Sequence, residues 1–178
     1  MNDYNPLTKD HSELRFIYFE RIDKWDLITI SAYSILTYLI FWQSDLISNI
    51  KAWGLGYTFG THLLLYGINY KSMRKFNVWL AWFIISILHL YIFYRSGLSI
   101  EFQFINGSGI SGMKFTWILL VLYQVFRYFS IRLMRVEFVA LNNSGGDIWD
   151  ERRTNRFDLI CFLIYFPTVI LINGDILI

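Results

Sequence analysis

The stretch "FNVWLAWFIISILHLYIFY", which runs from Phe76 to Tyr94, decides the class of fold. It carries no formal charge, and Lys75 and Arg95 bound it on either side. A helix of about 20 apolar residues is long enough to cross the roughly 30 Å hydrocarbon core of a bilayer. The stretch therefore predicts a membrane-spanning helix, with its charged neighbours at the two surfaces.

Four further apolar runs accompany it, at 27–44, 52–70, 115–133 and 159–174. Arg127 interrupts the fourth run toward one end, where a long side chain can reach the headgroups. Pro167 lies inside the last run and predicts either a bent span or a re-entrant segment. We therefore predict an all-α membrane protein, with residues 1–178 forming one transmembrane bundle of five spans.

The overall composition supports a bilayer environment. Apolar residues make up 55% of the chain and charged residues 17%, whereas about a quarter of an ordinary soluble domain is charged. The net charge of +2 is small and the basic residues are dispersed, so we expect no nucleic-acid partner. Cys161 is the single cysteine, which excludes an internal disulfide and a cysteine-rich metal site. No motif indicates a cofactor or a bound metal.

The distribution of lysine and arginine over the connections predicts the orientation, because cytoplasmic loops carry the excess. One side holds Lys9, Arg15, Arg21, Lys24, Lys71, Arg74, Lys75, Arg132, Arg135, Arg152, Arg153 and Arg156. The other side holds only Lys51, Arg95 and Lys114. We expect a multi-pass protein of the cell membrane with its amino terminus in the cytoplasm and its carboxyl terminus outside.

Two cytoplasmic elements are expected outside the spans. Apolar residues at helical spacing, from about Ser12 onward, predict an amphipathic helix lying on the membrane surface before the first span. Residues 134–158 predict a helical hairpin whose arms continue membrane helices. Tryptophan and arginine dominate contact energies at interfaces, so this hairpin is a candidate docking surface for a soluble protein, although its arginines could instead bind anionic lipid. The candidate surface consists of Trp149, Arg152, Arg153 and Arg156.

Two motifs resemble those of rhomboid intramembrane proteases. The segment "INGSGISGMKF" (105–115) contains a G-x-S-G sequence around Ser111, and "GTHLLLYGINY" (60–70) places His62 in the second run. The resemblance implies that Ser111 is a nucleophile. The chain departs from the family pattern because it has no histidine after His89, which leaves His89 as the candidate base, and because Tyr66 replaces the family's asparagine. The alternative interpretation of Ser111 is a residue of a flexible, glycine-rich connecting loop.

Several polar residues and glycines lie within the predicted spans. His62, His89, Gln124 and Arg127 are candidates for a polar interior, which could be a ligand or ion pathway or interhelical hydrogen bonding. For Arg127 we expect an ion pair with Asp158 or Asp26. Gly56 and Gly60 form a G-x-x-x-G pattern, which favours close packing of another helix, from this chain or from a second copy.

Three functional classes follow. The first is a small membrane subunit that forms a homo-oligomer and acts as a pore, or as an anchor recruiting a cytoplasmic protein. The second is a small transporter or ligand-binding bundle lined by His62, His89 and Gln124. The third is a divergent rhomboid-like protease that uses Ser111.

Overall fold

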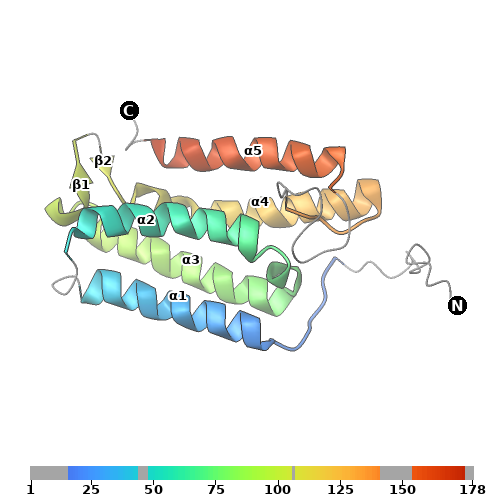
Figure 1. Cartoon of the computed structure of the whole chain (residues 1–178), viewed down its shortest axis with the longest axis horizontal. Coiled ribbons are helices and arrows are strands. Elements are labelled where there is room, and N and C mark those ends of the chain that lie inside the picture. The colour runs from blue at the N-terminus through green and yellow to red at the C-terminus, as the bar shows by residue number, and fades with distance from the viewer. Residues whose placement is uncertain (1–15, 44–47, 106, 141–153, 175–178) are drawn as a thin grey trace, which may run out of the picture.

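The computed structural model describes residues 16–43, 48–105, 107–140 and 154–174, and the described chain is mostly helical. Five helices lie side by side with their long axes nearly parallel (Figure 1). They are α1 (Lys24–Trp42), α2 (Ile50–Leu63), α3 (Phe76–Ser96), α4 (Thr116–Phe129) and α5 (Arg156–Ile172). Successive helices run in opposite directions.

Short elements extend or connect these helices. Two π-helical turns continue α2 and α4, at Leu64–Ile68 and Ser130–Met134, and a 3-10 helix at Ser111–Phe115 leads into α4. Further 3-10 turns lie at Ser72–Arg74 and Ile100–Phe102. The strands β1 (Gln103–Phe104) and β2 (Gly107–Ser108) pair antiparallel, with Gln103 opposite Ser108. We call the end that carries these strands the β-hairpin end.

Three of the described helical segments are long and apolar enough to cross a membrane: Lys24–Trp42, Phe76–Ser96 and Ser111–Met134. Helix α5 has 17 residues and keeps Pro167 within it, and α2 has 14 residues before its π-helical continuation. Both helices lie alongside the three candidate spans (Figure 1). The structure thus shows a mostly helical bundle with three candidate spans.

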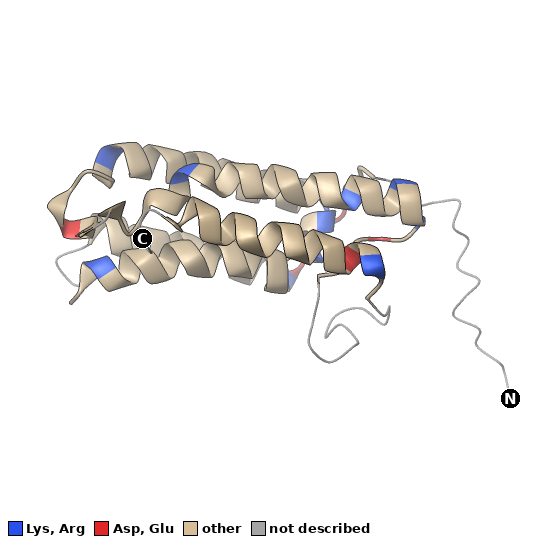
Figure 2. Cartoon of the chain, turned by 90° about the horizontal axis from the view of Figure 1, so that it is seen from above, with Lys and Arg blue, Asp and Glu red and all other residues tan. Residues whose placement is uncertain are grey.

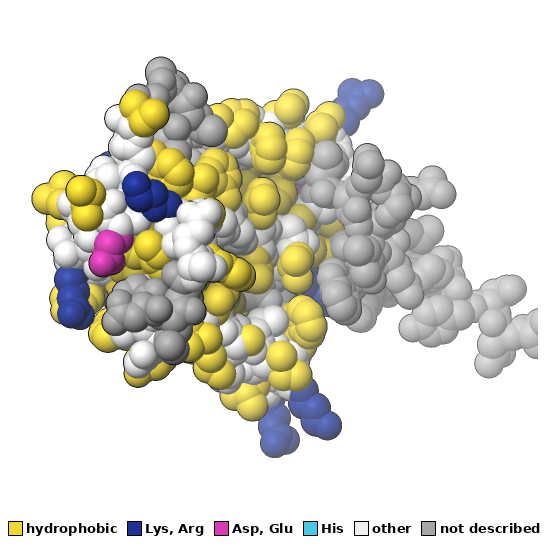
Figure 3. Space-filling model, turned by 60° about the vertical axis from the view of Figure 1, so that its left-hand side comes forward, with side chains coloured by type: hydrophobic (Ala, Val, Ile, Leu, Met, Phe, Trp, Pro, Cys, Tyr) yellow, Lys and Arg dark blue, Asp and Glu magenta, His cyan; other side chains and the backbone are white. Residues whose placement is uncertain are grey.

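The sides of the bundle are apolar and its ends are charged. Leucine, isoleucine and aromatic side chains are exposed along all five helices, for example Leu36, Ile84 and Leu163. Hydrophobic side chains cover much of the face shown in Figure 3. Charged residues gather near the two ends and leave the middle almost free of charge (Figure 2). This distribution suits a molecule whose middle is surrounded by hydrocarbon.

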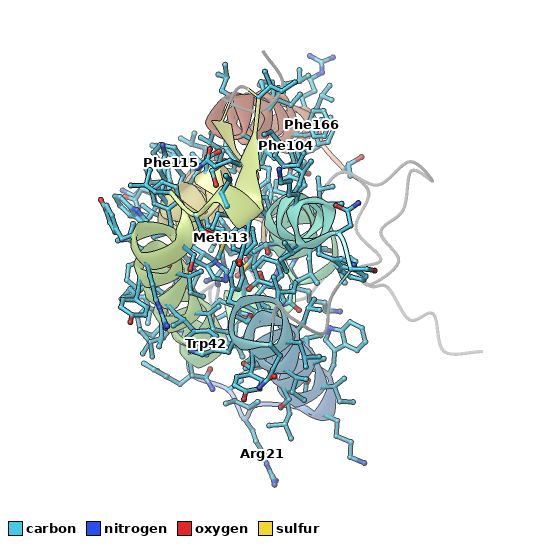
Figure 4. The ribbon with its side chains drawn as sticks, turned by 90° about the vertical axis from the view of Figure 1, so that its left-hand side faces the viewer. Arg21, Trp42, Phe104, Met113, Phe115 and Phe166 are labelled. Carbon is cyan, nitrogen blue, oxygen red and sulfur yellow. The ribbon has the colours of Figure 1, made fainter. Side chains whose placement is uncertain are left out.

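The core lies where the helices converge. Seen from the β-hairpin end, the helices surround a centre that contains Met113, while Arg21 extends away from the bundle (Figure 4). Met113, Trp82 and Tyr123 are almost completely buried. Tyr66 stacks on Tyr165 with ring centroids 4.3 Å apart, which joins α2 and its continuation to α5.

The expected amphipathic helix before the first span is wrong over the part that the structure describes. Residues 16–23 are not helical, and α1 begins at Lys24 behind a capping box formed by Asp23 and Asp26. Backbone carbonyls of the segment bond to distant partners: Tyr18 O accepts from the Phe76 amide at 3.0 Å, and Glu20 O accepts from Asn77 Nδ2 at 2.8 Å. These bonds satisfy groups that a helix would otherwise pair locally.

The expected helical hairpin at 134–158 also differs from the structure. The helix ends at Met134, Arg135 adopts a left-handed backbone conformation with φ of 54°, and residues 136–140 are not helical. Phe138 and Val139 are fully buried, so this segment packs back into the bundle instead of projecting from it. Residues 154 and 155 are not helical, and α5 begins at Arg156 behind an Asn155–Asp158 capping box. Residues 141–153, which include Trp149, Arg152 and Arg153, lie outside the described part of the chain.

Candidate functional site

A network of buried polar side chains occupies the half of the bundle nearer the β-hairpin end. Every one of its members is at least nine-tenths buried, and all five helices or their immediate ends contribute. Because an unpaired polar group in an apolar interior costs several kcal/mol, such a set must satisfy its own hydrogen bonds. The members are Tyr33, Thr37, Tyr57, Thr61, His62, His89, Thr116, Tyr165 and Asn173.

Thr116, at the start of α4, brings the two histidines together. Its Oγ1 lies 3.3 Å from His62 Nε2 and 3.3 Å from His89 Nδ1. The same hydroxyl donates to the carbonyl of Met113 at 3.1 Å. With its proton used in that bond, Thr116 Oγ1 can only accept from the rings, so His62 Nε2 and His89 Nδ1 are the donors.

The other nitrogen of each ring also has a partner. Asn173 Nδ2 lies 3.2 Å from His62 Nδ1, and Tyr57 OH lies 2.8 Å from His89 Nε2. His62 thus has one donor and one acceptor nitrogen, the pattern of the neutral imidazole. Both histidines are thereby fully bonded to other helices, an arrangement that suits interhelical hydrogen bonding.

Helix α1 joins the network through tyrosine and threonine hydroxyls. Tyr33 OH bonds to Thr61 Oγ1, and Thr37 Oγ1 lies 2.6 Å from Tyr57 OH. The Tyr33 and Tyr57 rings stack with centroids 5.1 Å apart. On the opposite side of the bundle, Tyr165 of α5 donates to the carbonyl of His62 at 2.8 Å.

Ser111 is a buried residue of a 3-10 helix, not part of a flexible loop. It is 4% exposed, and its Oγ has no hydrogen-bond partner among the described residues. The adjacent Gly112 approaches Asn173 so closely that a Cβ at position 112 would lie 2.1 Å from Asn173 Oδ1. The G-x-S-G motif thus lies beside the residue that holds His62, although Ser111 hydrogen-bonds to neither His62 nor His89.

Arg127 and Gln124 belong to a second polar cluster, toward the opposite end of the bundle. The Arg127 guanidinium is almost fully buried and binds Glu137 through both carboxylate oxygens, at 2.9 and 2.8 Å. It also donates to the Phe16 carbonyl at 2.7 Å. The partner is therefore Glu137 and not Asp158 or Asp26, because residues 135–140 fold back under α4. Gln124 Nε2 donates to the Met73 carbonyl at 3.4 Å.

Asp26 and Asp158, the partners expected for Arg127, have other roles. Asp26 completes the capping box of α1 and accepts from Lys75 Nζ at 2.7 Å. Asp158 caps α5 and accepts from the Val139 amide at 3.3 Å. Arg74 Nη2 donates to the Phe138 carbonyl at 2.6 Å, which helps to hold the buried segment in place.

Gly56 and Gly60 lie on the outer face of α2. Both are exposed, and a Cβ at either position would meet no atom of the described chain within 4 Å. They therefore do not pack against another helix that the structure describes in the same copy. Next to them, a groove of about 450 Å³ lies between α2 and α5 and is lined by residues that include Gly60, Gly67 and Phe166.

Sequence reasoning missed the residues that connect the histidines. Thr116 lies near the start of the fourth apolar run and Asn173 near the end of the fifth. Polar residues at these positions are expected at the boundary of a span, so the sequence did not indicate that they belong to a network. Tyr57 and Tyr33 could not be distinguished by sequence from the many other aromatic residues of the spans.

Of the expected docking surface, the structure describes only Arg156, which is exposed at the start of α5. Among the described residues, no group of three or more His, Cys, Asp or Glu side chains could hold a metal ion.

Comparisons with protein-family models, with curated proteins and with solved structures find no match. The resemblance of the two motifs to rhomboid proteases consequently rests on the residues of this chain alone.

Proposed function

We propose that this chain is a five-span membrane subunit that assembles with a second copy through the outer face of α2. The basic end, which we define by Lys24, Lys75, Arg132 and Arg156, faces the cytoplasm. The proposal adds α2, with its π-helical continuation, and α5 to the three candidate spans. The excess of lysine and arginine at the basic end supports this orientation.

The exposed glycine face of α2 carries the assembly proposal. Gly56, Gly60, Leu63 and Gly67 are exposed and follow helical spacing. Between membrane helices the driving force is van der Waals packing, because lipid is as apolar as leucine, and small residues permit the closest approach. The space outside these glycines is open, because a Cβ built at Gly56, Gly60 or Gly67 would meet no described atom within 4 Å. A second α2 helix placed along this face would fill that space. A symmetric pair of this kind buries the same surface on both copies.

The buried polar network supports a structural role for the interior. Both nitrogens of His62 and of His89 are bonded within the bundle. A transport pathway would need such groups to be free to exchange partners with a solute. We infer that these residues hold the helices in register and that function resides at the surfaces.

The basic end is the proposed docking surface for a soluble cytoplasmic protein, with Trp149, Arg152, Arg153 and Arg156 as its contact residues. We expect Trp149→Ala to weaken capture of a protein partner without changing membrane insertion. If every co-purifying protein stays bound to Trp149→Ala, the docking role is wrong.

The copy number tests the assembly. Native mass spectrometry of the protein in nanodiscs should show a dimer for the wild type and mainly a monomer for Gly60→Ile. The matched control is Ala32→Ile, which places the same side chain at an exposed small residue of α1. Equal copy numbers for the two variants would contradict an interface on α2.

One observation favours a second candidate function, a serine hydrolase. Ser111 has a buried hydroxyl without a partner, in a motif that packs against Asn173, which in turn holds His62. A nucleophilic serine requires a base within hydrogen-bond reach, and a change that released His62 from Thr116 would be needed to supply it. Labelling with a fluorophosphonate tests this role: loss of label in Ser111→Ala but not in Ser108→Ala supports a hydrolase. Absence of labelling in the wild type rejects it.

A further inference from the structure

A groove of about 460 Å³ runs along the side of the bundle, toward the basic end. The N-terminal segment, α3 and α4 line it with Phe16, Ile17, Phe76, Trp79, Val121, Gln124, Val125, Tyr128 and Phe129. Apart from the amide of Gln124 and the phenol of Tyr128, the side chains that line it are hydrocarbon or aromatic rings. In a chain that lies in a membrane, such a groove faces lipid.

The groove and the arginine beyond it together span about one leaflet. Its α4 wall follows one helical face, with Val121, Val125 and Phe129 at successive turns. Arg132 continues the same face one turn beyond Tyr128 and is exposed. Arg132 follows Val121 by eleven positions, the last of them in the π-helical turn that continues α4. This is about 16 Å of helix, and half of the hydrocarbon core is about 15 Å.

The wall formed by the N-terminal segment is held rigidly. Arg127 donates to the Phe16 carbonyl at 2.7 Å and its guanidinium lies over the Phe16 ring, 5.5 Å from the centroid. Phe16 also packs edge-on against Tyr128, with centroids 5.6 Å apart. On the other wall, Phe76 and Trp79 stack, and Trp79 Nε1 donates to the Leu120 carbonyl. The groove is therefore a formed feature with fixed sides.

From these observations we propose that the groove binds one acyl chain of an anionic phospholipid from the leaflet at the basic end, with Arg132 on the phosphate. The apolar walls match the chain, the distance from Val121 to Arg132 matches the depth of one leaflet, and this places the guanidinium at headgroup depth. Arginine binds phosphate oxygens through two parallel hydrogen bonds. The inference depends on the proposed membrane placement of α3 and α4, and it is independent of the assembly through α2.

Lipid retention measured by native mass spectrometry tests the proposal. The protein is reconstituted into an equimolar mixture of phosphatidylglycerol and phosphatidylcholine, and the lipids that remain bound after transfer to detergent are counted. We expect the wild type to retain phosphatidylglycerol preferentially. Arg132→Gln should reduce the ratio of the two retained lipids about fivefold, the effect of one basic residue near a membrane surface, whereas Arg132→Lys should keep most of it.

Two further variants separate the parts of the site. Lys24→Gln removes an exposed positive charge at the same end, on α1, and should leave the ratio unchanged. Val125→Trp fills the groove and should reduce retention of both lipids. The proposal is overturned if the wild type retains no lipid, if the ratio falls equally in Arg132→Gln and Lys24→Gln, or if Val125→Trp changes the copy number while lipid retention stays the same. Loss of the dimer in Gly60→Ile with lipid retention intact would separate this site from the assembly.

Discussion

Neutralising Glu137 should destabilise the protein, because its carboxylate is bonded to the buried guanidinium of Arg127. In Glu137→Gln, one of the two oxygens that accept from Arg127 becomes an amide donor, and the guanidinium is left buried with a single acceptor on that side chain. Removing one partner of a buried ion pair costs about 3–5 kcal/mol. The Glu137 side chain is 19% exposed, so water screens part of the loss and we expect about 3 kcal/mol.

That loss corresponds to a fall in melting temperature of roughly 6–12 °C for a chain of this size. Cys161 provides the assay, because it is the single cysteine of the chain and is almost fully buried. A thiol-reactive fluorophore added in detergent during a temperature ramp reports its exposure. Glu101→Gln, at an exposed carboxylate of the β-hairpin end, is the matched control and should melt like the wild type.

The double variant Arg127→Met with Glu137→Leu gives a sharper test of the same reasoning. Replacing both members of a buried pair by apolar residues is often neutral. Here it removes the buried Arg127 charge, and only Arg74 Nε, which lies 3.9 Å from Glu137 Oε2, loses an ion-pair partner. We expect the double variant to melt above Glu137→Gln. Two results would contradict the reasoning: a melting temperature of Glu137→Gln equal to that of Glu101→Gln, or a double variant that is the least stable of all. Either would mean that the ion pair does not hold the 135–140 segment in the bundle.

Two further predictions concern the helix ends. A hydrogen bond from Lys75 lowers the pKa of Asp23 below its usual 3.8. Burial alone would lower the pKa of Lys75, but its bonds to Asp23 and to a neighbouring carboxylate raise that pKa above 10.5. The stability that Lys75→Gln removes should thus be constant between about pH 5 and 9, and shrink as the pH falls below 3.8 or rises above 10.5, as melting curves across pH will show. In Gly112→Ala the new methyl would overlap Asn173, so chemical denaturation should show a loss of about 1–3 kcal/mol. Gly174→Ala, where a Cβ would meet no described atom within 4 Å, should lose none.

The helices could be predicted from the sequence because each is a run of apolar residues bounded by charge or by a capping residue. The start of α3 at Phe76 agrees with the expected run, and α5 begins three residues before the expected Leu159. Hydrocarbon length and charge are local properties of the chain. They suffice to locate a membrane helix without knowledge of its neighbours.

The extended segments at 16–23 and 135–140 could not be predicted in the same way. Their backbone groups bond to residues far along the chain: Phe16 O to Arg127, and Phe138 O to Arg74. Local spacing suggested helix in both, and long-range hydrogen bonds override that preference. The partner of Arg127 was missed for the same reason, since depth in the membrane suggested Asp158 or Asp26 but the fold of the 135–140 segment brings Glu137.

The polar interior was only partly predictable. An ionisable side chain in an apolar run is an evident candidate, so His62 and His89 could be named from the sequence. Their connection through Thr116 could not, because threonine is common in membrane helices and its partner depends on how the helices rotate. Asn173 was hidden by its position at the end of the fifth run.

Cysteine cross-linking in native membranes tests the central claim, assembly through the outer face of α2, most directly. Single cysteines at positions 56, 60 and 63, each in a Cys161→Ser background, are oxidised and compared with a cysteine at Ala32 on the exposed side of α1. The account predicts a covalent dimer for at least one of the α2 positions and none at position 32. A dimer that forms only through position 32, or no dimer from any α2 position, would contradict it.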